Sequence, residues 1–354
     1  MAFHSRQGLP RSEAGGGTRR KHPRALTGAL VALALALAGG PGASPATAIP
    51  PERCDAVAGP GQSAPDLLDR LGPGQTGCFR AGTYRFSLLG INSDVTLGPY
   101  GRQRVTLQGE IKVRPSGAGS TIQGMTLDGR GGDSRIGPRI YADRVTLRNN
   151  EITNHHTSIC VQIGSWYDGP PPRGVVIERN RIHDCGERPT TNKDHGVYVS
   201  EARNTVIRDN WIYDNVDRGI QLYHDADGSK VTGNVILQNG DGIVINADSS
   251  DNEIHGNIIF DSVLGWNVYG GNDGSGSNNY VHNNCLRALN PDPDYNVNGG
   301  IQPEQLHFQA SHNRIAPINH VFVNRKGRDL RMQYVSACRG IYKGTLSLPW
   351  APKR

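Results

Sequence analysis

The sequence predicts an all-β, single-domain solenoid in which each repeat is one coil of three short strands. An Asn-x-Ile or Asn-x-Leu motif recurs through the middle of the chain, and successive motif asparagines are 30, 30, 24, 23 and 27 residues apart. A coil of about 22–30 residues, rich in β-branched residues and without helical spacing, is typical of a β-solenoid. The motif asparagines are Asn150, Asn180, Asn210, Asn234, Asn257 and Asn284.

Each coil supplies three apolar segments in fixed register with its asparagine. One aliphatic residue stands three positions before the asparagine and another two positions after it, as Leu147 and Ile152 do around Asn150. A third segment of the form Gly-apolar-x-apolar follows, as at Gly219–Leu222. Alternation with period two directs its first apolar residue into the solenoid and the next residue outward. The residues predicted to point inward are Val197, Ile220, Ile243 and Trp266, and those predicted to point outward are Tyr198, Gln221, Val244 and Asn267.

The column of asparagines has a structural explanation. Asparagine tolerates the left-handed backbone conformation that a sharp turn between strands requires. Stacked side-chain amides can also form hydrogen bonds along the solenoid. We therefore assign this column to the turns of the fold and not to the binding of a ligand.

The coil pattern resembles the right-handed parallel β-helix proteins of the pectate lyase-like superfamily over roughly residues 75–345. Residues 67–85 resemble the capping helix and first coil of secreted bacterial members, and residues 322–340 resemble their last coil. The resemblance implies an N-terminal capping segment at residues 49–74, a right-handed parallel β-helix and a C-terminal tail at residues 346–354. This superfamily contains lyases, epimerases, hydrolases and proteins without known chemistry, so the fold does not decide the function.

The first 48 residues are expected to be a cleaved signal peptide. A basic region at residues 19–24 precedes an apolar stretch at residues 25–38, and Ala46-Thr47-Ala48 fits a small-residue cleavage site. An uncleaved membrane anchor is the alternative, but the apolar stretch is short for a span. We expect a secreted protein without stable membrane insertion after cleavage.

Removal of the leader changes the net charge of the chain. Residues 1–48 hold six Lys or Arg residues and one Glu, so subtracting their +5 from the total of +6 leaves about +1. A nearly neutral chain without a basic stripe gives little support to nucleic-acid binding. We expect a monomer that does not bind nucleic acid.

All six cysteines follow the predicted cleavage site, and an even number in an exported chain indicates disulfides. A zinc site is disfavoured because no two cysteines stand two to four residues apart. Among the possible pairings we favour the sequential ones, Cys54–Cys78, Cys160–Cys185 and Cys285–Cys338.

Polar residues that stack on the outer face of the Gly-apolar strands form the candidate site. His195, Arg218 and Asp241 each stand just before such a strand and would be neighbours on three successive coils. Tyr269 is expected in the second outward row of the same face. The candidate catalytic residues are His195, Arg218, Asp194, Asp217, Lys193 and Tyr198, and the candidate substrate-binding residues are Gln221, Tyr223, Asp241, Asn246 and Tyr269.

This set suits an enzyme that abstracts a proton beside the carboxylate of a uronate sugar, with polysaccharide as its partner. The reaction needs a base, a cation that neutralises the carboxylate, and an acid for the leaving oxygen or the opposite ring face. His195 is the candidate base, Arg218 the partner of the carboxylate, and Tyr198 or Tyr223 the acid. Asp194 or Asp217 would orient the imidazole and raise its basicity. Lys193 is a spare base.

Family resemblance supports elimination or epimerisation. Asp194-His195-Gly196 resembles the placement of the catalytic histidine in mannuronan C5-epimerase-type β-helices, although their Asp-Pro-His-Asp motif is incomplete here. The Lys/Arg pair of alginate lyase-type β-helices would correspond to Lys193 and Arg218. Of the polygalacturonase-type hydrolase signatures, only His195-Gly196 is present. Hydrolysis by paired aspartates drawn from Asp194, Asp217 and Asp241 is an alternative.

A non-catalytic explanation also stays open. Asp before Gly is a common turn pair, so Asp194, Asp217 and Asp241 would then shape strand entries in a glycan-binding or cell-surface β-helix. Calcium is the one cofactor left open, but residues 225–228 lack most ligands of an EF-hand loop and favour a turn. The insertion at residues 185–194 leads into the candidate site and is the best candidate for a groove wall.

Overall fold

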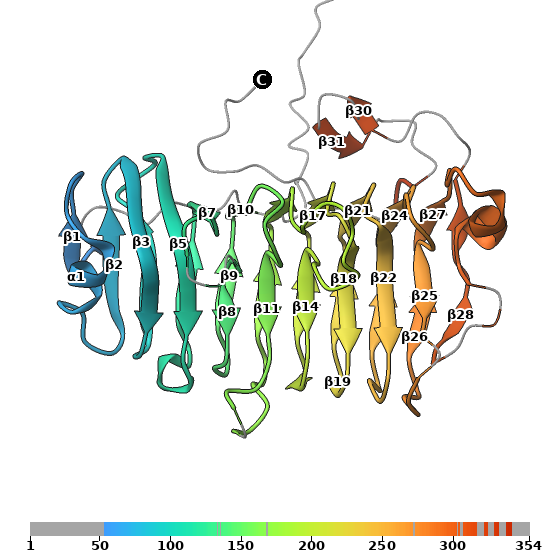
Figure 1. Cartoon of the computed structure of the whole chain (residues 1–354), viewed down its shortest axis with the longest axis horizontal. Coiled ribbons are helices and arrows are strands. Elements are labelled where there is room, and N and C mark those ends of the chain that lie inside the picture. Colours follow the sequence, from blue (N-terminus) through green and yellow to red (C-terminus); the bar gives the residue numbers. More distant parts are fainter. Residues whose placement is uncertain are drawn as a thin grey trace, which may run out of the picture. The chain divides into compact units, whose positions relative to one another are not determined.

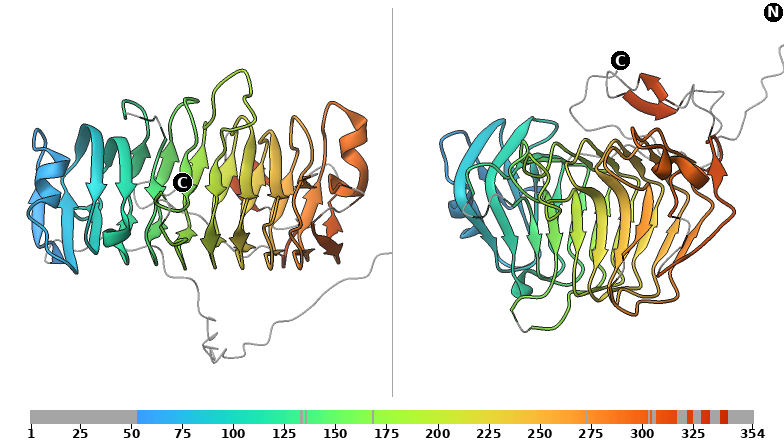
Figure 2. Two further views of the ribbon diagram at one scale, coloured as in Figure 1. Left: turned by 60° about the horizontal axis from the view of Figure 1, so that its bottom comes forward. Right: turned by 45° about the vertical axis from the view of Figure 1, so that its right-hand side comes forward.

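The computed structural model of the protein describes residues 53–132, 134, 136–167, 169–271, 273–302, 304, 307–316, 322–324, 329–332 and 338–341. The signal peptide predicted at residues 1–48 and the tail predicted at residues 346–354 lie outside these residues. The described part of the chain is a right-handed parallel β-helix, as predicted. Its coils stack side by side along one axis, as Figure 1 and Figure 2 show.

Three rows of parallel strands form three faces, and each coil between residues 121 and 270 adds one strand to each face in turn. Face 1 is an 11-stranded sheet of β1 (Ala56–Ala58), β2 (Gln75–Phe79), β4 (Val95–Pro99), β6 (Thr121–Gln123), β9 (Thr146–Arg148), β12 (Val176–Glu178), β16 (Val206–Arg208), β20 (Lys230–Thr232), β23 (Glu253–His255), β26 (Tyr280–His282) and β28 (Gln309–Ser311). Face 2 consists of β7 (Thr126–Asp128), β10 (Glu151–Thr153), β13 (Arg181–His183), β17 (Trp211–Tyr213), β21 (Val235–Leu237), β24 (Ile258–Phe260), β27 (Cys285–Arg287) and β29 (Arg314–Ile315). Face 3 consists of β8 (Arg139–Ile140), β11 (Val161–Ile163), β14 (Val197–Val199), β18 (Arg218–Tyr223), β22 (Asp241–Asn246) and β25 (Val268–Gly270).

The remaining elements join the rows or lie at corners and ends. The long strand β5 (Val105–Val113) pairs with β7 on face 2, with β8 on face 3 and with β3 (Gly82–Ile91). The other described elements are α1 (Ala64–Leu68), the 3-10 helices η2 (Pro115–Gly117) and η3 (Pro293–Gly299), the pair β15 (Ala202–Arg203) and β19 (Ala226–Asp227), and the pair β30 (Phe322–Asn324) and β31 (Asp329–Met332).

The core is a set of stacked aliphatic columns, one behind each face. On face 1 Ile177 lies opposite Ile207, and on face 2 Ile182 lies opposite Ile212. All four side chains are fully buried. Burial of each such side chain contributes about 1.5–3 kcal/mol relative to its exposure. On face 3 the inward positions predicted from the sequence at Val197, Ile220 and Ile243 are likewise fully buried.

The predicted register is wrong by two residues in one coil of face 3. Ile243 lies opposite Val268 and not opposite Trp266, because the corner from Phe260 to Val268 is two residues longer than the equivalent corner from Leu237 to Ile243. Asn267, predicted to point outward, is buried, and its side chain donates to the carbonyl of Gly299 at 2.7 Å. Trp266, predicted to point inward, is partly exposed.

The predicted amide ladder runs through the corner between faces 1 and 2. From Asn150 to Asn284, the backbone N–H of each motif asparagine donates to Oδ1 of the asparagine on the next coil at 2.9–3.0 Å. The side-chain Nδ2 donates to a carbonyl of the preceding coil, as Asn180 does to Leu147 at 2.9 Å. Each asparagine therefore ties its own coil to both neighbouring coils.

The left-handed turn residue is not the ladder asparagine itself, which corrects the sequence prediction. The residue before it carries the positive φ, as at Arg179 (54°), Asp209 (57°) and Gly233 (66°). The preceding residue turns the chain, and the asparagine places its amide in the buried corner, where it can reach two coils.

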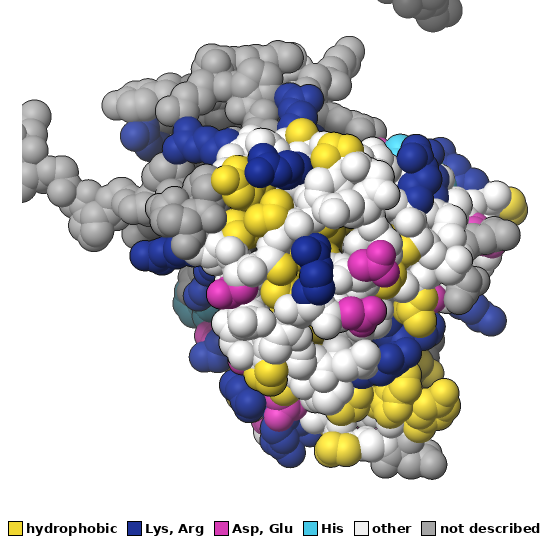
Figure 3. All heavy atoms as spheres, turned by 90° about the vertical axis from the view of Figure 1, so that its left-hand side faces the viewer, with side chains coloured by type: hydrophobic (Ala, Val, Ile, Leu, Met, Phe, Trp, Pro, Cys, Tyr) yellow, Lys and Arg dark blue, Asp and Glu magenta, His cyan; other side chains and the backbone are white. Residues whose placement is uncertain are grey.

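The first coil is closed by α1, as predicted. Ser63 caps this helix by accepting a hydrogen bond from the N–H of Asp66 at 3.3 Å, and Leu67 packs over Gly77 of the first coil. The disulfide Cys54–Cys78 joins β1 to β2. Figure 3 shows this end of the molecule, where basic, acidic, polar and apolar side chains are mixed. No helix among the described residues is long and apolar enough to cross a membrane.

The C-terminal segment does not form the last coil that the sequence predicted. Strands β30 and β31 pair antiparallel with each other and belong to neither long sheet. Phe322 and Leu330 pack with outward apolar residues of face 2, among them Leu237 and Phe260. The disulfide Cys285–Cys338 fixes the segment there. The segment covers outward apolar side chains on face 2 that would otherwise be exposed to water.

The ladder makes a stability prediction. Replacement of Asn234 by Ala removes the acceptor for two donors of Asn210 and leaves them buried. We expect the free energy of unfolding in urea to fall by about 1–3 kcal/mol for each buried group left without a partner. The matched control Asn92→Ala removes an exposed amide and should change it by less than about 0.5 kcal/mol. Equal effects of the two substitutions would contradict this account.

Candidate functional site

Face 3 carries two continuous rows of outward residues. The first row is Lys112, Arg139, Gln162, Tyr198, Gln221, Val244 and Tyr269, each opposite the next. The second row follows two residues later in each coil and consists of Arg114, Tyr141, Gly164, Ser200, Tyr223, Asn246 and Gly271. Tyr269 therefore lies in the first row and not in the second, because of the longer corner before β25.

The predicted column His195, Arg218 and Asp241 lies at the entrance to three adjacent strands of this face. Arg218 is opposite Asp241, and the backbone of His195 is two residues before the pair formed by Val197 and Ile220. The glycine that follows each column residue permits this stacking. A Cβ atom on Gly196 would lie 2.8 Å from the side-chain nitrogen of a buried corner asparagine.

A cleft of about 280 Å³ opens beside this column. Its walls come from the insertion at residues 186–194, from the entrances to β18, β22 and β25, and from η3. The rings of Trp266 and Tyr295 meet edge to face, with centroids 5.0 Å apart. The lining residues are Thr190, Asn192, Asp217, Asp241, Leu264, Gly265, Trp266, Tyr269 and Tyr295.

Sequence reasoning placed Asp217, Asp241 and Tyr269 in this site but missed several wall residues. The sequence predicts that Trp266 points into the core and does not single out Tyr295. Asn192 belongs to the insertion that the sequence predicts as a groove wall, but it is not predicted as a site residue. The irregular coil lengths were the available signal, since Tyr295 and Asn192 lie in insertions that interrupt the repeat.

Arg218 and Asp241 form a close pair at the cleft. Nε of Arg218 lies 3.7 Å from Oδ2 of Asp241, and Nη1 donates to the carbonyl of Asn192 at 3.2 Å and to Gln221 at 3.4 Å. The Nε atom is buried and has no hydrogen-bond partner among the described residues. Burial raises the pKa of Asp241 to about 6, although Arg218 acts in the opposite direction. This carboxyl group can therefore exchange a proton near neutral pH.

The burial of His195 and its lowered pKa do not suit a general base. Its side chain is 2% exposed, and burial together with the charge of Arg218 lowers its pKa to about 3. Nδ1 is buried and has no hydrogen-bond partner among the described residues, and the ring centroid of Tyr198 lies 5.5 Å from that of His195. A neutral imidazole with so low a pKa is a weak base at neutral pH.

Asp194 and Asp217 hold the insertion in place and do not orient the imidazole, which corrects the contact expected from the sequence. Asp217 accepts hydrogen bonds from the hydroxyl of Thr190 and, at 2.8 Å, from the N–H of Asp194. Asp194 accepts from the hydroxyl of Thr191 at 2.8 Å and from Ser158 at 3.3 Å. Their short side chains therefore bond to the backbone and hydroxyls around the insertion and not to the imidazole of His195.

The other predicted residues lie on face 3 or on its rim. Lys193 is exposed on the insertion. Tyr198 and Tyr223 are partly exposed, and burial raises the pKa of Tyr198. Gln221 is buried beside Arg218. Oδ1 of Asn246 is buried without a hydrogen-bond partner among the described residues.

Of the eight buried side-chain polar atoms without a hydrogen-bond partner among the described residues, three lie on this face. Nδ1 of His195, Nε of Arg218 and Oδ1 of Asn246 are all buried without partners among the described residues. A buried polar group without a partner costs about 1–3 kcal/mol. Such groups are uncommon in folded proteins and are often satisfied by a ligand or water. Three of them on one face mark it as a candidate binding surface.

No group of three or more His, Cys, Asp or Glu side chains suited to a metal ion occurs among the described residues. In the turn considered for calcium, Asp227 is ion-paired with Arg203 at 2.6 Å and accepts a hydrogen bond from the N–H of Ser250. We assign no step of the chemistry to calcium.

A larger hollow of about 500 Å³ lies on face 1, and its residues include Glu253, Tyr280 and His282. Glu253 lies 3.2 Å from His282 and 3.9 Å from Lys230, and Asp251 accepts a hydrogen bond from Asn278 at 3.2 Å. None of its lining side chains carries a buried polar atom without a partner. We therefore place the candidate site on face 3 despite the larger volume here.

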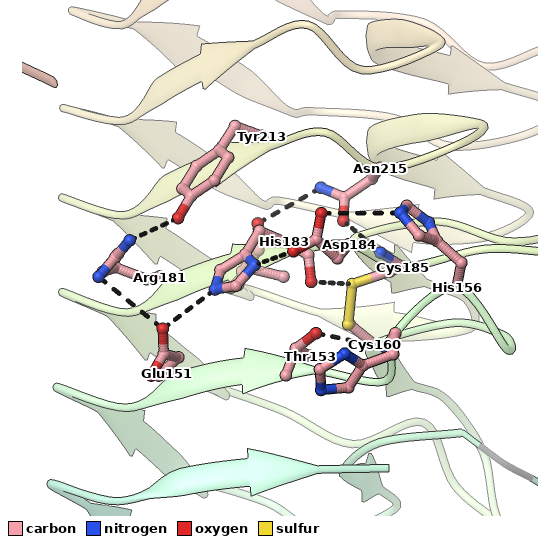
Figure 4. Close-up of polar contacts among 12 residues, drawn as sticks. Glu151, Thr153, His156, Cys160, Arg181, His183, Asp184, Cys185, Tyr213 and Asn215 are labelled. Carbon is pink, nitrogen blue, oxygen red and sulfur yellow. Dashed lines mark hydrogen bonds and ion pairs between the residues drawn. A yellow bond between two sulfur atoms is a disulfide. The ribbon is translucent and has the colours of Figure 1, made fainter. Parts of the chain in front are cut away.

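A second polar cluster lies on face 2, where Figure 4 shows its side chains pointing toward one another. The imidazole of His183 lies between Asp184, at 2.8 Å, and Glu151, at 3.2 Å, and is stacked on the ring of Tyr213. Arg181 donates to the hydroxyl of Tyr213 at 2.7 Å. The disulfide Cys160–Cys185, one of the three sequential pairings expected, follows directly. This cluster anchors the start of the insertion.

Comparison with known proteins shows that the chain is similar to other β-helices. The chain matches the family described as "Right handed beta helix region" over residues 108–304. The structure is similar to pectate lyase Pel9A, with a TM-score of 0.53, 12% identity, and coverage of 80% of this chain and 90% of that chain. At that identity the likeness concerns the fold alone.

Two epimerases are more distant structural matches. The periplasmic alginate epimerase AlgG has a TM-score of 0.39 at 14% identity, covering 69% of this chain and 60% of that one. The A-module of the Azotobacter vinelandii mannuronan C-5 epimerase AlgE4 has a TM-score of 0.39 at 16% identity, covering 71% and 89%. No curated protein sequence matches the chain.

The face 2 cluster predicts a pH-dependent stability. Burial disfavours the imidazolium of His183, but hydrogen bonds to Asp184 and Glu151 outweigh it and raise its pKa. Its stabilisation is therefore complete below the unfolded pKa of about 6.5 and is lost as pH rises through the folded pKa. We expect His183→Gln to lower the free energy of unfolding more at pH 5.5 than at pH 9, whereas exposed His312→Gln should show no such difference. A loss for His183→Gln that does not vary with pH would contradict this assignment.

Proposed function

The chain belongs to the right-handed β-helix family, and on that premise we propose that it is an exported enzyme that acts on a uronate-containing polysaccharide by β-elimination or C5-epimerisation. One observation carries the proposal. On face 3, a buried guanidinium with an unpartnered N–H adjoins a carboxyl group of pKa about 6 at a cleft with aromatic walls. The leader features at residues 1–48 and the three disulfides support export.

Recognition of a uronate sugar follows from these groups. The sugar carboxylate would accept a hydrogen bond from Nε of Arg218, which has no hydrogen-bond partner among the described residues and lies 3.7 Å from Asp241. The rings of Trp266, Tyr269 and Tyr295 present apolar surfaces to the faces of the sugar rings. A neutral glycan would leave the guanidinium without a counter-charge from the ligand, so an acidic polymer fits best.

The chemistry begins with removal of the proton on C5 of the sugar. Pairing of the sugar carboxylate with Arg218 acidifies this proton, and the carboxylate of Asp241 takes it, with the electron pair passing into the sugar carboxylate. A base with a pKa near the working pH is suited to this transfer. We assign His195, which is neutral and covered, as a positioning residue beside Arg218 and not as the base.

Two outcomes are open to the resulting enolate-type intermediate. In elimination, its electron pair forms the C4–C5 double bond while the bond from C4 to the glycosidic oxygen breaks and that oxygen receives a proton. In epimerisation, C5 receives a proton on the opposite ring face. Tyr269 lines the same cleft and is the candidate proton donor in either case. Tyr198 and Tyr223 lie on neighbouring strands of the same face.

Hydrolysis is the second candidate, and one observation favours it. Asp217 and Asp241 line the same cleft, and their surroundings differ. Asp217 accepts two hydrogen bonds, while the pKa of Asp241 is raised, so Asp241 would serve as acid and Asp217 as base. Hydrolysis yields saturated sugar ends, whereas elimination yields an unsaturated uronate.

The direct test is turnover of alginate, polygalacturonate, hyaluronan and chondroitin by the oxidised, secreted protein. Unsaturated uronate is followed by ultraviolet absorbance and epimerisation by proton NMR. We expect Asp241→Asn to lower kcat by about 10²–10⁴-fold, the usual contribution of a general base. The rate of the wild type should rise as pH increases through about 6, because the base must be ionised. Exposed Asp69→Asn should leave the rate unchanged.

Further variants separate the alternatives. The rate of His195→Gln should still rise as the pH increases through about 6. Loss of that rise in this variant would indicate that His195 is the base. Saturated sugar ends that disappear in Asp217→Asn would establish hydrolysis in place of elimination. An unchanged rate in Asp241→Asn, or no product from any of these polymers, would contradict the proposed function.

A further inference from the structure

The first outward row of face 3 continues well beyond the cleft. From Tyr269 at the cleft it runs through the neighbouring strands to Gln162 and Arg139 and ends at Lys112. The distance from β25 to β8 is five strand spacings of about 4.8 Å, or about 24 Å. A linear polymer lying along the axis can therefore reach both ends of this row by passing over Gln221 and Val244, which are buried.

The far end of this row has an excess of positive charge. Lys112 and Arg139 approach the same oxygen of buried Glu110, at 3.3 Å and 3.4 Å. Arg114, in the second row, adds a third cation and donates to an uncharged side-chain amide at 2.9 Å. Among these four residues the balance is three cations against one carboxylate. The side chains of Lys112 and Arg139 are 19% and 23% exposed, so a ligand can reach them.

An aromatic group lies over the second row at the same place. The rings of Tyr141 and Trp166 have centroids 4.9 Å apart, and those of Trp166 and Tyr167 have centroids 5.0 Å apart, both edge to face. Tyr167 is 83% exposed, the largest exposed fraction among the large hydrophobic side chains of the described residues. The guanidinium of Arg114 lies 6.0 Å from the ring of Trp166. Tyr167 therefore presents an exposed ring close to the excess of positive charge.

We infer that these residues, Lys112, Arg139, Tyr141, Trp166 and Tyr167, form a distal region that binds anionic sugar units of the polymer held in the cleft. The tyrosine and tryptophan rings pack on sugar rings, and the two cations pair with uronate carboxylates. This inference rests on the proposed function for the identity of the polymer. Because one chain occupies the cleft and the distal region together, a polymer binds more tightly than either contact alone permits.

The test measures binding without turnover. Alginate, polygalacturonate and their disaccharides are titrated into Asp241→Asn protein, with and without the added substitution Tyr167→Ala or Lys112→Gln. Tyr167 lies on an exposed loop and Lys112 leaves Glu110 paired with Arg139, so both variants should fold. We expect each to raise the Kd of the polymer about 10-fold, as for the loss of about 1.4 kcal/mol, and to leave the Kd of the disaccharide unchanged.

The control is Tyr280→Ala, which removes a tyrosine that is 46% exposed on face 1. It should leave the affinity for polymer unchanged. Unchanged affinity in Tyr167→Ala and Lys112→Gln, an equal loss for the disaccharide, or no binding of either polymer would overturn the distal region. Since every protein in this test carries Asp241→Asn, its outcome is independent of whether Asp241 is the catalytic base.

Discussion

The hydrogen bonds between successive coils are the constraint on which the rest of the structure depends. At the corner between faces 1 and 2, each ladder asparagine bonds to the coil before it and to the coil after it. These bonds fix the register of all three faces, and a slip of one residue would exchange inward and outward side chains along a strand. The column of Arg218 and Asp241 exists only because this register holds over adjacent coils.

The candidate site is built where this regular frame is interrupted. The insertion at residues 186–194 leaves the frame at a disulfide, returns at His195, and is held by Asp194 and Asp217. The carbonyl of Asn192 in this insertion accepts a hydrogen bond from Arg218, and the side chains of Arg218 and His195 are both buried. Polar atoms without partners remain there although they destabilise the fold, as expected for a surface shaped to bind a ligand. The asparagine ladder, which ties successive coils together from Asn150 to Asn284, offsets that cost.

Much of the fold could be predicted from the sequence, because the same apolar and asparagine positions recur in successive coils. The ladder positions, the inward aliphatic columns and the neighbouring positions of His195, Arg218 and Asp241 all follow from spacing alone. The register of Trp266 could not be predicted, because a corner two residues longer leaves no mark in the apolar pattern. The hydrogen bonds of Asp194 to Thr191 and Asp217 could not be predicted either, because they depend on how the insertion folds back and do not recur in other coils. The antiparallel pairing of β30 and β31 could not be predicted, because it depends on packing against the outward apolar side chains of face 2.

The most direct measurement for the central claim, that face 3 binds an acidic polysaccharide, is a crystal structure of the Asp241→Asn protein with a uronate oligosaccharide. The account predicts a sugar chain lying along the axis across β18, β22 and β25, with one carboxylate within hydrogen-bond distance of Nε of Arg218. An oligosaccharide bound in the hollow of face 1, or bound on face 3 with no carboxylate near Arg218, would contradict it.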